Sequence, residues 1–291
     1  MRQDLDLQTL RFFCAAVEEG SLTRAAHRLN YAQSNLSTRI HALEEELGAV
    51  LFERSSEGVR LTARGEVLYA YAQRLLHLAG ETASAVREED VPAGTLQLGS
   101  MESAALSFLP ALLRAYHRQY PNVRTILHTM PSQQAIEAVL DYRLDAAIVG
   151  GEVRHPQLET VPLTREQLVL IAPEDGPVDA LLRMPLVAFP RSCAYRRRLE
   201  EIRARWGVVS DEVMEMESLG AIFASVSAGL GVSLFPRSTV EALGAGRQVA
   251  VAPLPFEQAD IPVSMIHRRE GSVRAAIRAM ARCFQEASGD I

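Results

Sequence analysis

Hydrophobic residues near the start of the chain recur at helical spacing in three successive segments. In the third segment, steps of four, three and four residues separate the apolar positions of one helix face, which are Leu36, Ile40, Leu43 and Leu47. The first predicted helix carries Leu7, Leu10, Phe13, Cys14 and Val17. We expect Gly20 to end it, Ser21 to cap a second helix over Leu22–Leu29, and Gly48 to end the third.

A short connection at Asn30 and Tyr31 joins the second predicted helix to the third, which is typical of a helix-turn-helix. Two apolar stretches then alternate as strands, Val50–Phe52 and Val59–Leu61, around a polar turn at Ser55–Gly58. This pattern predicts a wing beside the helices. A three-helix structural domain with a solvated hairpin fits the same periodicity.

The outward face of the third predicted helix is small and polar near its start. It carries Ser34, Thr38 and His41, and Asn35 and Ser37 flank them. In a helix-turn-helix, the residues near the start of the recognition helix meet base edges in the major groove. The face is therefore a candidate for DNA recognition.

The next segment has a hydrophobic repeat close to a heptad. From Gly65 to Arg87, residues on one side recur three and four positions apart, at Leu68, Tyr71, Leu75, Leu78 and Thr82. The stretch EEDVPAG that follows is a linker by composition. A helix that leaves a small domain and ends in a linker favours pairing with a second subunit, and packing on its own domain is the alternative.

Beyond Gly94, strand and helix patterns alternate. The first strands are expected at Thr95–Gly99, Val123–Thr129 and Ala146–Val149, and the helices at Ala104–Tyr120 and Gln134–Leu144. The alternation continues through LVLIAP, PLVAFP, YRRRLEEIRARWG, LGAIFASVSAGLG and VSLFP. It predicts an α/β region with largely parallel sheets, as one large domain or two small lobes.

Ligands of open α/β folds bind at the carboxyl ends of strands, against the amino ends of helices. This rule selects the segments after each predicted strand, which are Ser100 to Ser103, Thr129 to Gln133, Gly150 and Gly151, Arg191 to Arg196, Glu217 and Ser218, and the turn near Gly231.

Length and composition allow two or three domains, because 291 residues with 48% hydrophobic content can form ordinary buried cores. No apolar run reaches the roughly 18 residues of a membrane span. The start, MRQDLDLQTL, is polar and acidic where a secretory signal would be apolar. Cys14, Cys193 and Cys283 lie far apart, so we expect a cytoplasmic protein with reduced thiols.

The net charge of −6 argues weakly against a nucleic-acid partner. The first 66 residues contain eight arginines against ten Asp and Glu residues. Any positive surface for DNA must therefore be local. Arg54, Arg60 and Arg64 supply one, since they gather in the short segment of the predicted wing and can reach phosphates beside the groove.

Motifs of enzymes and metal sites are missing from the sequence. There is no G-x-S-x-G, P-loop or H-E-x-x-H, and the serines of SVSAG only superficially suggest a nucleophile turn. The seven histidines show no paired spacing. We therefore expect neither an enzyme nor a cofactor or metal. Cys193 is interpreted as a buried or bystander thiol in preference to a redox sensor.

The stretch LQTLRFFCAAVEEGSLTRAAHRLNYAQSNLSTRIHALEEELGAVLFERSSEGVRLTARG resembles the winged helix-turn-helix of LysR-type transcriptional regulators along its whole length. By this resemblance, Gln33, Ser34 and Ser37 lie on the recognition helix, and Arg54 of LFER is a backbone-clamping arginine. The full set expected to contact DNA is Gln33, Ser34, Asn35, Ser37, Thr38, Arg39, Arg54, Arg60 and Thr62. Asn35 and Thr38 depart from the common family residues, so the operator sequence cannot be transferred.

The rest of the chain resembles the family's regulatory domain, most specifically in SVSAGLGVSLFPRS and also in YPNVRTILHT and LDAAIVG. The implied fold class is α/β, with an N-terminal winged helix-turn-helix plus linker helix and then a two-lobed periplasmic-binding-protein-like (type 2) regulatory domain. The expected parts are residues 1–65, the linker helix and hinge at 66–94, and the regulatory domain at 95–291. Lobe one is expected at about 95–162 and 267–291, and lobe two at about 163–266.

Family pockets use the strand ends selected above. GSMESAALSFLP and CAYRRRLE also resemble a family subset in which Cys193, Tyr195 and Arg196 open a helix facing the cleft. The expected effector-binding residues are Ser100, Met101, Glu102, Ser103, Thr129, Gln133, Gly150, Cys193, Tyr195, Arg196, Glu217 and Ser218. Arg196 is either a solvated helix residue, the slightly favoured interpretation, or a carboxylate clamp. Glu102 and Glu217 either receive a cationic ligand such as an amine or only favour helix amino ends.

The resemblance also implies the partners. Linker helices would pair through Leu68, Tyr71, Leu75 and Leu78 to give a homodimer, and regulatory domains would pair further to give a homotetramer. A dimer places two recognition helices on half-sites about one helical turn apart. The expected partners are double-stranded promoter DNA and a small-molecule effector, with RNA polymerase as a candidate and no membrane.

Overall fold

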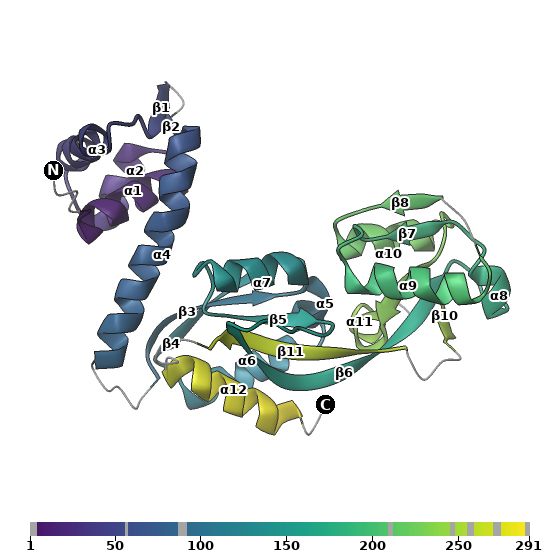
Figure 1. Ribbon diagram of the computed structural model, residues 1–291. Coiled ribbons are helices and arrows are strands. Elements are labelled where there is room, and N and C mark those ends of the chain that lie inside the picture. The colour runs from purple at the N-terminus through teal and green to yellow at the C-terminus, as the bar shows by residue number, and fades with distance from the viewer. Residues whose placement is uncertain are drawn as a thin grey trace. The chain divides into compact units, whose positions relative to one another are not determined.

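The computed structural model describes residues 5–55, 58–86, 92–208, 212–244, 248–254, 259–269 and 275–288. The chain divides into two compact units (Figure 1). The first is Met1–Glu88 with Asp141–Arg143, and the second is Glu89–Leu140 with Leu144–Ile291. Within the described residues, every helix is too short or too polar to serve as a membrane-spanning segment.

The first unit is a helical head followed by a long helix (Figure 1). Its described elements are α1 (Leu7–Glu19), α2 (Leu22–Leu29), α3 (Gln33–Leu47), β1 (Phe52–Ser55), β2 (Gly58–Leu61) and α4 (Ala63–Val86). The predicted helix boundaries are confirmed. Ser21 caps α2 by accepting the N–H of Arg24, and Gly20 and Gly48 end α1 and α3 in the left-handed conformation, with φ of 58° and 59°.

The apolar faces of α1, α2 and α3 meet in one core, in which Phe13, Leu36 and Ile40 are fully buried. β1 and β2 form the wing as an antiparallel hairpin, with Phe52 opposite Leu61. The strand predicted at Val50–Phe52 begins two residues later and ends three residues later, at Phe52 and Ser55. The carboxylate of Glu44 accepts the N–H groups of Leu51 and Phe52, at 2.8 and 3.3 Å, so this segment is tied to α3 before the hairpin begins.

Helix α4 has one face against the head and another in solvent. Ala72 is buried, and Leu68, Tyr69 and Leu76 are partly buried against the head core. Val67, Tyr71, Leu75 and Leu78 are exposed and form a second stripe at steps of four, four and three. The prediction that Leu68 belongs to the intermolecular seam is therefore corrected. It lies four residues before Ala72 and eight before Leu76, on the face that packs on its own domain.

The second unit is an α/β region built on one large sheet (Figure 1). Its described elements are β3 (Gly94–Ser100), α5 (Glu102–Leu106), α6 (Leu109–Gln119), β4 (Val123–Thr129), α7 (Ser132–Leu140), β5 (Ala146–Gly150), β6 (Leu158–Ala172), α8 (Val178–Leu181), β7 (Leu186–Ala188), α9 (Ala194–Arg205), β8 (Val213–Glu215), α10 (Leu219–Ser227), β9 (Ser233–Pro236), α11 (Arg237–Ala242), β10 (Ala250–Pro253), β11 (Asp260–Arg268) and α12 (Ala275–Ser288).

The sheet is mixed, which corrects the prediction of largely parallel sheets. Its order is β10-β6-β11-β5-β3-β4, and β9 also pairs with β6. Among the described strands of this sheet, β3 runs parallel to β4 and β5, and the separate pair of β7 and β8 is also parallel. The long strands β6 and β11 run antiparallel to each other, and β11 runs antiparallel to β5. The sequence pattern of alternating strands and helices did not reveal that β11 returns in the opposite direction.

Two lobes share this sheet. We call β3–β5, α5–α7 and α12 lobe one, and β7–β10 and α8–α11 lobe two, while β6 and β11 run through both (Figure 1). In lobe one, α12 packs on α6, and the hydroxyl of Tyr116 donates to the carbonyl of Ala276 at 2.9 Å. In lobe two, apolar side chains of β6, β9 and α9 form a separate core.

Two predicted helices have different limits in the structure. The segment Ala104–Tyr120 forms two helices, α5 and α6, because the chain turns at Ser107 and Phe108 before Pro110 enters the first turn of α6. The helix predicted at Gln134–Leu144 begins at Ser132 and ends at Leu140, and Tyr142 beyond it has a positive φ of 59°.

The start of α4 generates a stability prediction. A Cβ atom on Gly65 would lie 2.2 Å from the carbonyl oxygen of Leu51, whereas one on Gly80 of the same helix would meet nothing within 4 Å. Gly65→Ala should therefore lower the free energy of unfolding by about 1–3 kcal/mol through overpacking. Gly80→Ala should raise it by up to about 1 kcal/mol through helix propensity. Thermal and urea unfolding of both variants checks this, and equal effects would contradict the close contact at Gly65.

Candidate functional site

The amino-terminal half of α3 presents the residues predicted to contact DNA. Gln33, Ser34, Asn35, Thr38 and Arg39 are exposed, and Ser37 is half-buried. This exposure follows from the helical period, since Leu36 and Ile40 turn into the head core. The hydroxyl of Thr38 donates to the carbonyl of Ser34 at 2.9 Å, and the guanidinium of Arg39 lies 3.4 Å from the carboxylate of Asp6.

The wing is attached to α3 through Glu44. One carboxylate oxygen of Glu44 accepts the backbone N–H groups before β1, and the other lies 3.6 Å from the guanidinium of Arg54. Ser37, Thr38 and Arg54 line the same open groove between α3 and the wing. Arg60 is exposed on β2, opposite Glu53. The structure thus brings Arg54 to the predicted recognition face.

Thr62 has a structural position that the sequence did not indicate. Its hydroxyl donates to the carbonyl of Val50 at 2.7 Å and accepts the N–H of Gly65 at 3.0 Å. It therefore caps the first turn of α4 and ties this turn to the segment before the wing. These bonds occupy the hydroxyl, so we remove Thr62 from the residues expected to contact DNA through their side chains.

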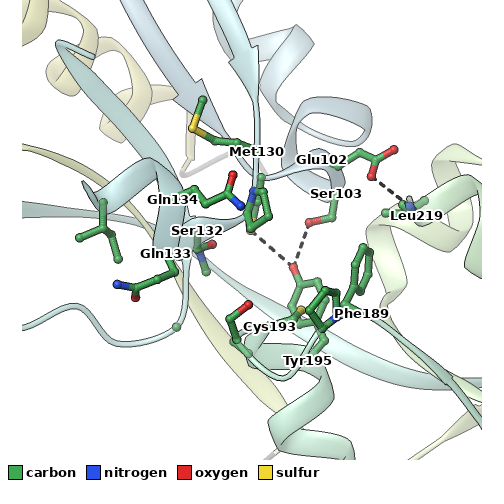
Figure 2. A pocket seen from close by; sticks show the side chains of 18 of the residues that line it. Glu102, Ser103, Met130, Ser132, Gln133, Gln134, Phe189, Cys193, Tyr195 and Leu219 are labelled. Carbon is green, nitrogen blue, oxygen red and sulfur yellow. Dashed lines mark hydrogen bonds between the residues drawn. The ribbon is translucent and has the colours of Figure 1, made fainter. Parts of the chain in front are cut away.

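A cavity of about 470 Å³ lies between the two lobes of the regulatory region (Figure 2). Loops at the carboxyl ends of β3, β4 and β5 line it from lobe one, and the segments before α9 and α10 line it from lobe two. The predicted effector-binding residues among its lining are Met101, Glu102, Ser103, Thr129, Gln133, Gly150, Cys193, Tyr195, Glu217 and Ser218. The strand-end rule therefore located this cavity.

Two of the predicted effector-binding residues do not line the cavity. Ser100 is fully buried, and its hydroxyl donates to the carbonyl of Met101 at 3.0 Å. It is the last residue of β3, and its side chain faces into the sheet core. The effector-binding assignment of Ser100 is therefore corrected.

Arg196 fits neither of its two interpretations, because its side chain is buried rather than solvated and is turned away from the cavity. It donates to the carboxylates of Glu200 and Glu215, at 2.9 and 2.5 Å, and to the carbonyl of Phe189 at 3.1 Å. Arg197 lines the cavity in its place. A step of about 100° per residue separates neighbouring side chains on a helix, so the sequence motif did not fix which arginine faces the cavity.

Hydrogen bonds link the lobes across the cavity floor (Figure 2). The hydroxyls of Ser103 in lobe one and Tyr195 in lobe two lie 2.9 Å apart, and the Tyr195 hydroxyl lies 3.6 Å from the sulfur of Met101. Glu102 accepts the N–H of Leu219 at the start of α10, at 3.0 Å. Burial raises the pKa of the Tyr195 phenol, so this group remains a protonated donor at neutral pH.

Some lining residues were not among those predicted. Phe189 and Pro190 follow β7 directly, and Leu219 begins α10. The strand-end rule could have found Phe189, because PLVAFP carries the strand and the residues just beyond it. Ser132, by contrast, lies within the selected segment Thr129 to Gln133 and lines the cavity at the start of α7, where its hydroxyl accepts the N–H of Gly150 at 3.0 Å.

The chemistry of the cavity favours binding over catalysis. Cys193 precedes α9 and lines the cavity, but burial raises the pKa of its thiol, while the backbone N–H groups of Arg196 and Tyr195 act in the opposite direction. The protonated thiol is a weak nucleophile at neutral pH. Among the described residues, no group of three or more His, Cys, Asp or Glu side chains is arranged to hold a metal ion.

Known proteins match both parts of the chain. Residues 7–66 match the family described as "Bacterial regulatory helix-turn-helix protein, lysR family", and residues 89–289 match "LysR substrate binding domain". The HTH-type transcriptional regulator SoxR of Arthrobacter sp. (strain TE1826) is 35% identical over 284 residues, which cover 97% of this chain and 98% of that protein. GltR of Bacillus subtilis (strain 168), also an HTH-type transcriptional regulator, is 35% identical over 279 residues, or 94% of each chain.

Solved structures are similar along the whole chain. A full-length variant of OxyR from Pseudomonas aeruginosa matches with a TM-score of 0.73 and 26% identity, over 97% of this chain and 95% of that one. Full-length CbnR, solved in complex with its target DNA, matches with a TM-score of 0.71 and 25% identity, over 97% and 100% of the two chains.

The bond between Ser103 and Tyr195 is testable by a double-mutant cycle. Tyr195→Phe removes only the hydroxyl and should lower the free energy of unfolding by about 1 kcal/mol, with coupling to Ser103→Ala of similar size. Tyr116→Phe, which loses a bond within lobe one, is the matched control and should not couple to Ser103→Ala. Urea unfolding of the full chain measures each value. Additivity of Tyr195→Phe and Ser103→Ala would show that the bond contributes nothing.

Proposed function

The chain belongs to the LysR family of bacterial transcriptional regulators, and on this premise we propose that it binds promoter DNA sequence-specifically under the control of a small-molecule effector held between its regulatory lobes. Its family and relatives are transcriptional regulators and not enzymes. The observation that carries the effector proposal is the cavity lined from both lobes and bridged by hydrogen bonds on its floor.

The head supplies what a DNA reader needs. Short polar side chains at the start of α3 can meet base edges, and Arg54 of the wing can neutralise a phosphate beside the groove. The similarity to CbnR, which was solved with its target DNA, supports a DNA partner for this chain. Positive charge is also present locally, because Arg54, Arg60 and Arg64 gather in and just after the wing while the acids of α3 follow the recognition face.

A ligand between two lobes can control the head only if it distinguishes two arrangements of the protein. The Ser103–Tyr195 and Glu102–Leu219 bonds exist in the arrangement seen here, and a change of lobe angle would break them. An effector that binds one arrangement better shifts the population by its differential affinity and no more. In our proposal, this shift changes the spacing or angle of paired heads and so the bend of the promoter.

The exposed stripe of α4 is the proposed dimer contact. Val67, Tyr71, Leu75 and Leu78 present apolar side chains to solvent at near-heptad spacing, and pairing two such stripes would remove them from water. The dimer would place two α3 helices on neighbouring half-sites. Further pairing of regulatory domains would give a homotetramer that acts in the cytoplasm and contacts RNA polymerase at the promoter.

The proposed function is tested by selecting an operator, the DNA sequence that the protein recognises. Selection from a randomised DNA library by the full-length protein should enrich a two-part site with half-sites about one helical turn apart. Titration of that operator then gives the affinity in the presence and absence of candidate effectors. Failure to enrich any sequence would contradict the proposed DNA reading.

Arg54 gives a specific prediction for DNA binding. Arg54→Ala should weaken binding to all DNA sequences alike and make the salt slope shallower by about one unit, because one phosphate contact is lost. Arg118→Ala changes an exposed arginine of α6 and should leave both quantities unchanged. Fluorescence anisotropy at several salt concentrations measures them. Normal affinity and salt dependence in Arg54→Ala would refute the assigned role.

Leu75 gives the corresponding prediction for assembly. Leu75→Glu places a charge in the middle of the exposed stripe, where pairing would bury it, and should yield smaller species with poor operator binding. Gln73→Glu adds the same charge elsewhere on α4 and is the control. Light scattering reports the mass. Wild-type mass and affinity in Leu75→Glu would mean that this stripe does not form the dimer contact.

A further inference from the structure

We propose that the effector carries an organic ammonium group, which binds between Glu102 of lobe one and Glu217 of lobe two. This inference rests on the proposed function, since it names the chemical class of ligand for the same cavity. It depends on three features of the site, which are the balance of charges on the cavity wall, the capped amino end of α10, and the origin of the two carboxylates in different lobes.

The cavity wall is negatively charged. Three carboxylates line it, those of Glu102, Glu152 and Glu217, against the single guanidinium of Arg197. Glu152 is at an exposed position and forms an ion pair with Arg154 at 2.9 Å. In the described part of the chain, neither Glu102 nor Glu217 takes part in an ion pair. These two carboxylates therefore remain to attract a cation.

The amino end of α10, which would attract an anion, is already capped by the protein. At the start of α10, Glu102 accepts the N–H of Leu219 at 3.0 Å and the hydroxyl of Ser218 accepts that of Ala221 at 3.5 Å. A carboxylate ligand at α10 would have to displace Glu102 and approach Glu217.

Arg196, for which a carboxylate clamp was one of two interpretations, is engaged elsewhere. It is 4% exposed, does not line the cavity, and holds Glu200, Glu215 and the carbonyl of Phe189. The arginine that lines the cavity, Arg197, is exposed and shares the wall with three acids. A cationic ligand leaves the bond of Glu102 to α10 in place, whereas an anion bound at that helix end would displace it.

The two carboxylates come from opposite lobes. Glu102 accepts the N–H of Leu219 (Figure 2), and Glu217 lies two residues before Leu219 in the chain, so both acids belong to the same end of α10. Like charges oppose this arrangement, and an ammonium group between them offsets the repulsion. The ligand then binds the bridged arrangement better than an open one, which is the differential affinity that regulation requires.

The rest of the wall defines the body of the ligand. Met130, Ile136 and Phe189 give it apolar surface, and Thr129, Ser132 and Gln133 give it neutral polar groups. A cavity of about 470 Å³ suits a small molecule. The inferred effector is therefore a small amine with a hydrocarbon or aromatic body.

Matched pairs of probes test the inference on the full-length protein. Phenethylamine and phenylacetate share an aromatic body and differ in charge, as 1,5-diaminopentane and glutarate share a linear chain. At equal ionic strength and millimolar concentration, the amines should raise Tm and the carboxylates should not. Calorimetry on Glu102→Gln/Glu217→Gln should show amine affinity lower by about tenfold or more for each carboxylate removed.

The controls separate this inference from the proposed function. Glu152→Gln removes a lining charge that is already paired and should keep the wild-type amine response. Glutamine at position 102 still offers an oxygen to Leu219, so the double variant should fold, which circular dichroism and cooperative thermal unfolding check before amine affinities are compared. If the wild-type protein enriched no sequence from the randomised DNA library, this result would count against the proposed function. It would not count against binding of an amine in the cavity, which the Tm measurements test.

Several results would overturn the ammonium inference. Stabilisation by phenylacetate or glutarate alone would keep the cavity as an effector site but reject a cationic ligand. Calcium chloride serves as a further arm, and a response to it without a response to amines would mean an inorganic cation site. No stabilisation by either amine, or full amine binding by Glu102→Gln/Glu217→Gln, would reject the inference outright.

Discussion

The antiparallel pairing of β6 with β11 is the constraint on which the regulatory domain depends. β11 pairs with β6 from Asp260 to Arg268, and beyond Leu168 the same β6 pairs with β9 and β10 of lobe two. Backbone hydrogen bonds along these strands must be kept in any arrangement, because unpaired buried amide groups are costly. The lobes are thus joined along one ladder, and the cavity lies where the loops of the two lobes face each other beside it.

Two kinds of contact join the lobes at the cavity. The strand pairing persists in every arrangement, whereas the hydrogen bonds between the lobes break when the lobe angle changes. The ladder holds the lobes together whatever the ligand, while the Ser103–Tyr195 and Glu102–Leu219 bonds depend on the angle between them. Each of these bonds contributes only about 1 kcal/mol net, since its groups also bond to water when the lobes separate. That magnitude matches the few kcal/mol by which effectors commonly couple to a second site.

The head uses one side chain to coordinate its two DNA-facing elements. Glu44 holds the backbone at the start of the wing and lies beside Arg54, so the wing and the polar face of α3 are positioned together. The core behind them is built from large side chains such as Phe13 and Leu36, which leave α3 little freedom to rotate. In a rigid head of this kind, the polar face of α3 and the wing keep their geometry when the distance to a second head changes.

The sequence by itself determined the local structure and the family. The period of Leu36, Ile40 and Leu43 predicted α3, and glycines with positive φ ended helices where expected, because these signals act within one or two turns. The strand-end rule located the cavity, since it needs only the order of strands and helices.

Only the tertiary structure decided the direction of the strands and which neighbours each side chain faces. The return of β11 made the sheet mixed, packing against the head took Leu68 out of the exposed stripe, and the rotation of α9 placed Arg197 on the wall while Arg196 held Glu215. These outcomes depend on contacts between residues distant in the chain. A periodic pattern gives the spacing of side chains along an element but not which neighbour each side chain meets.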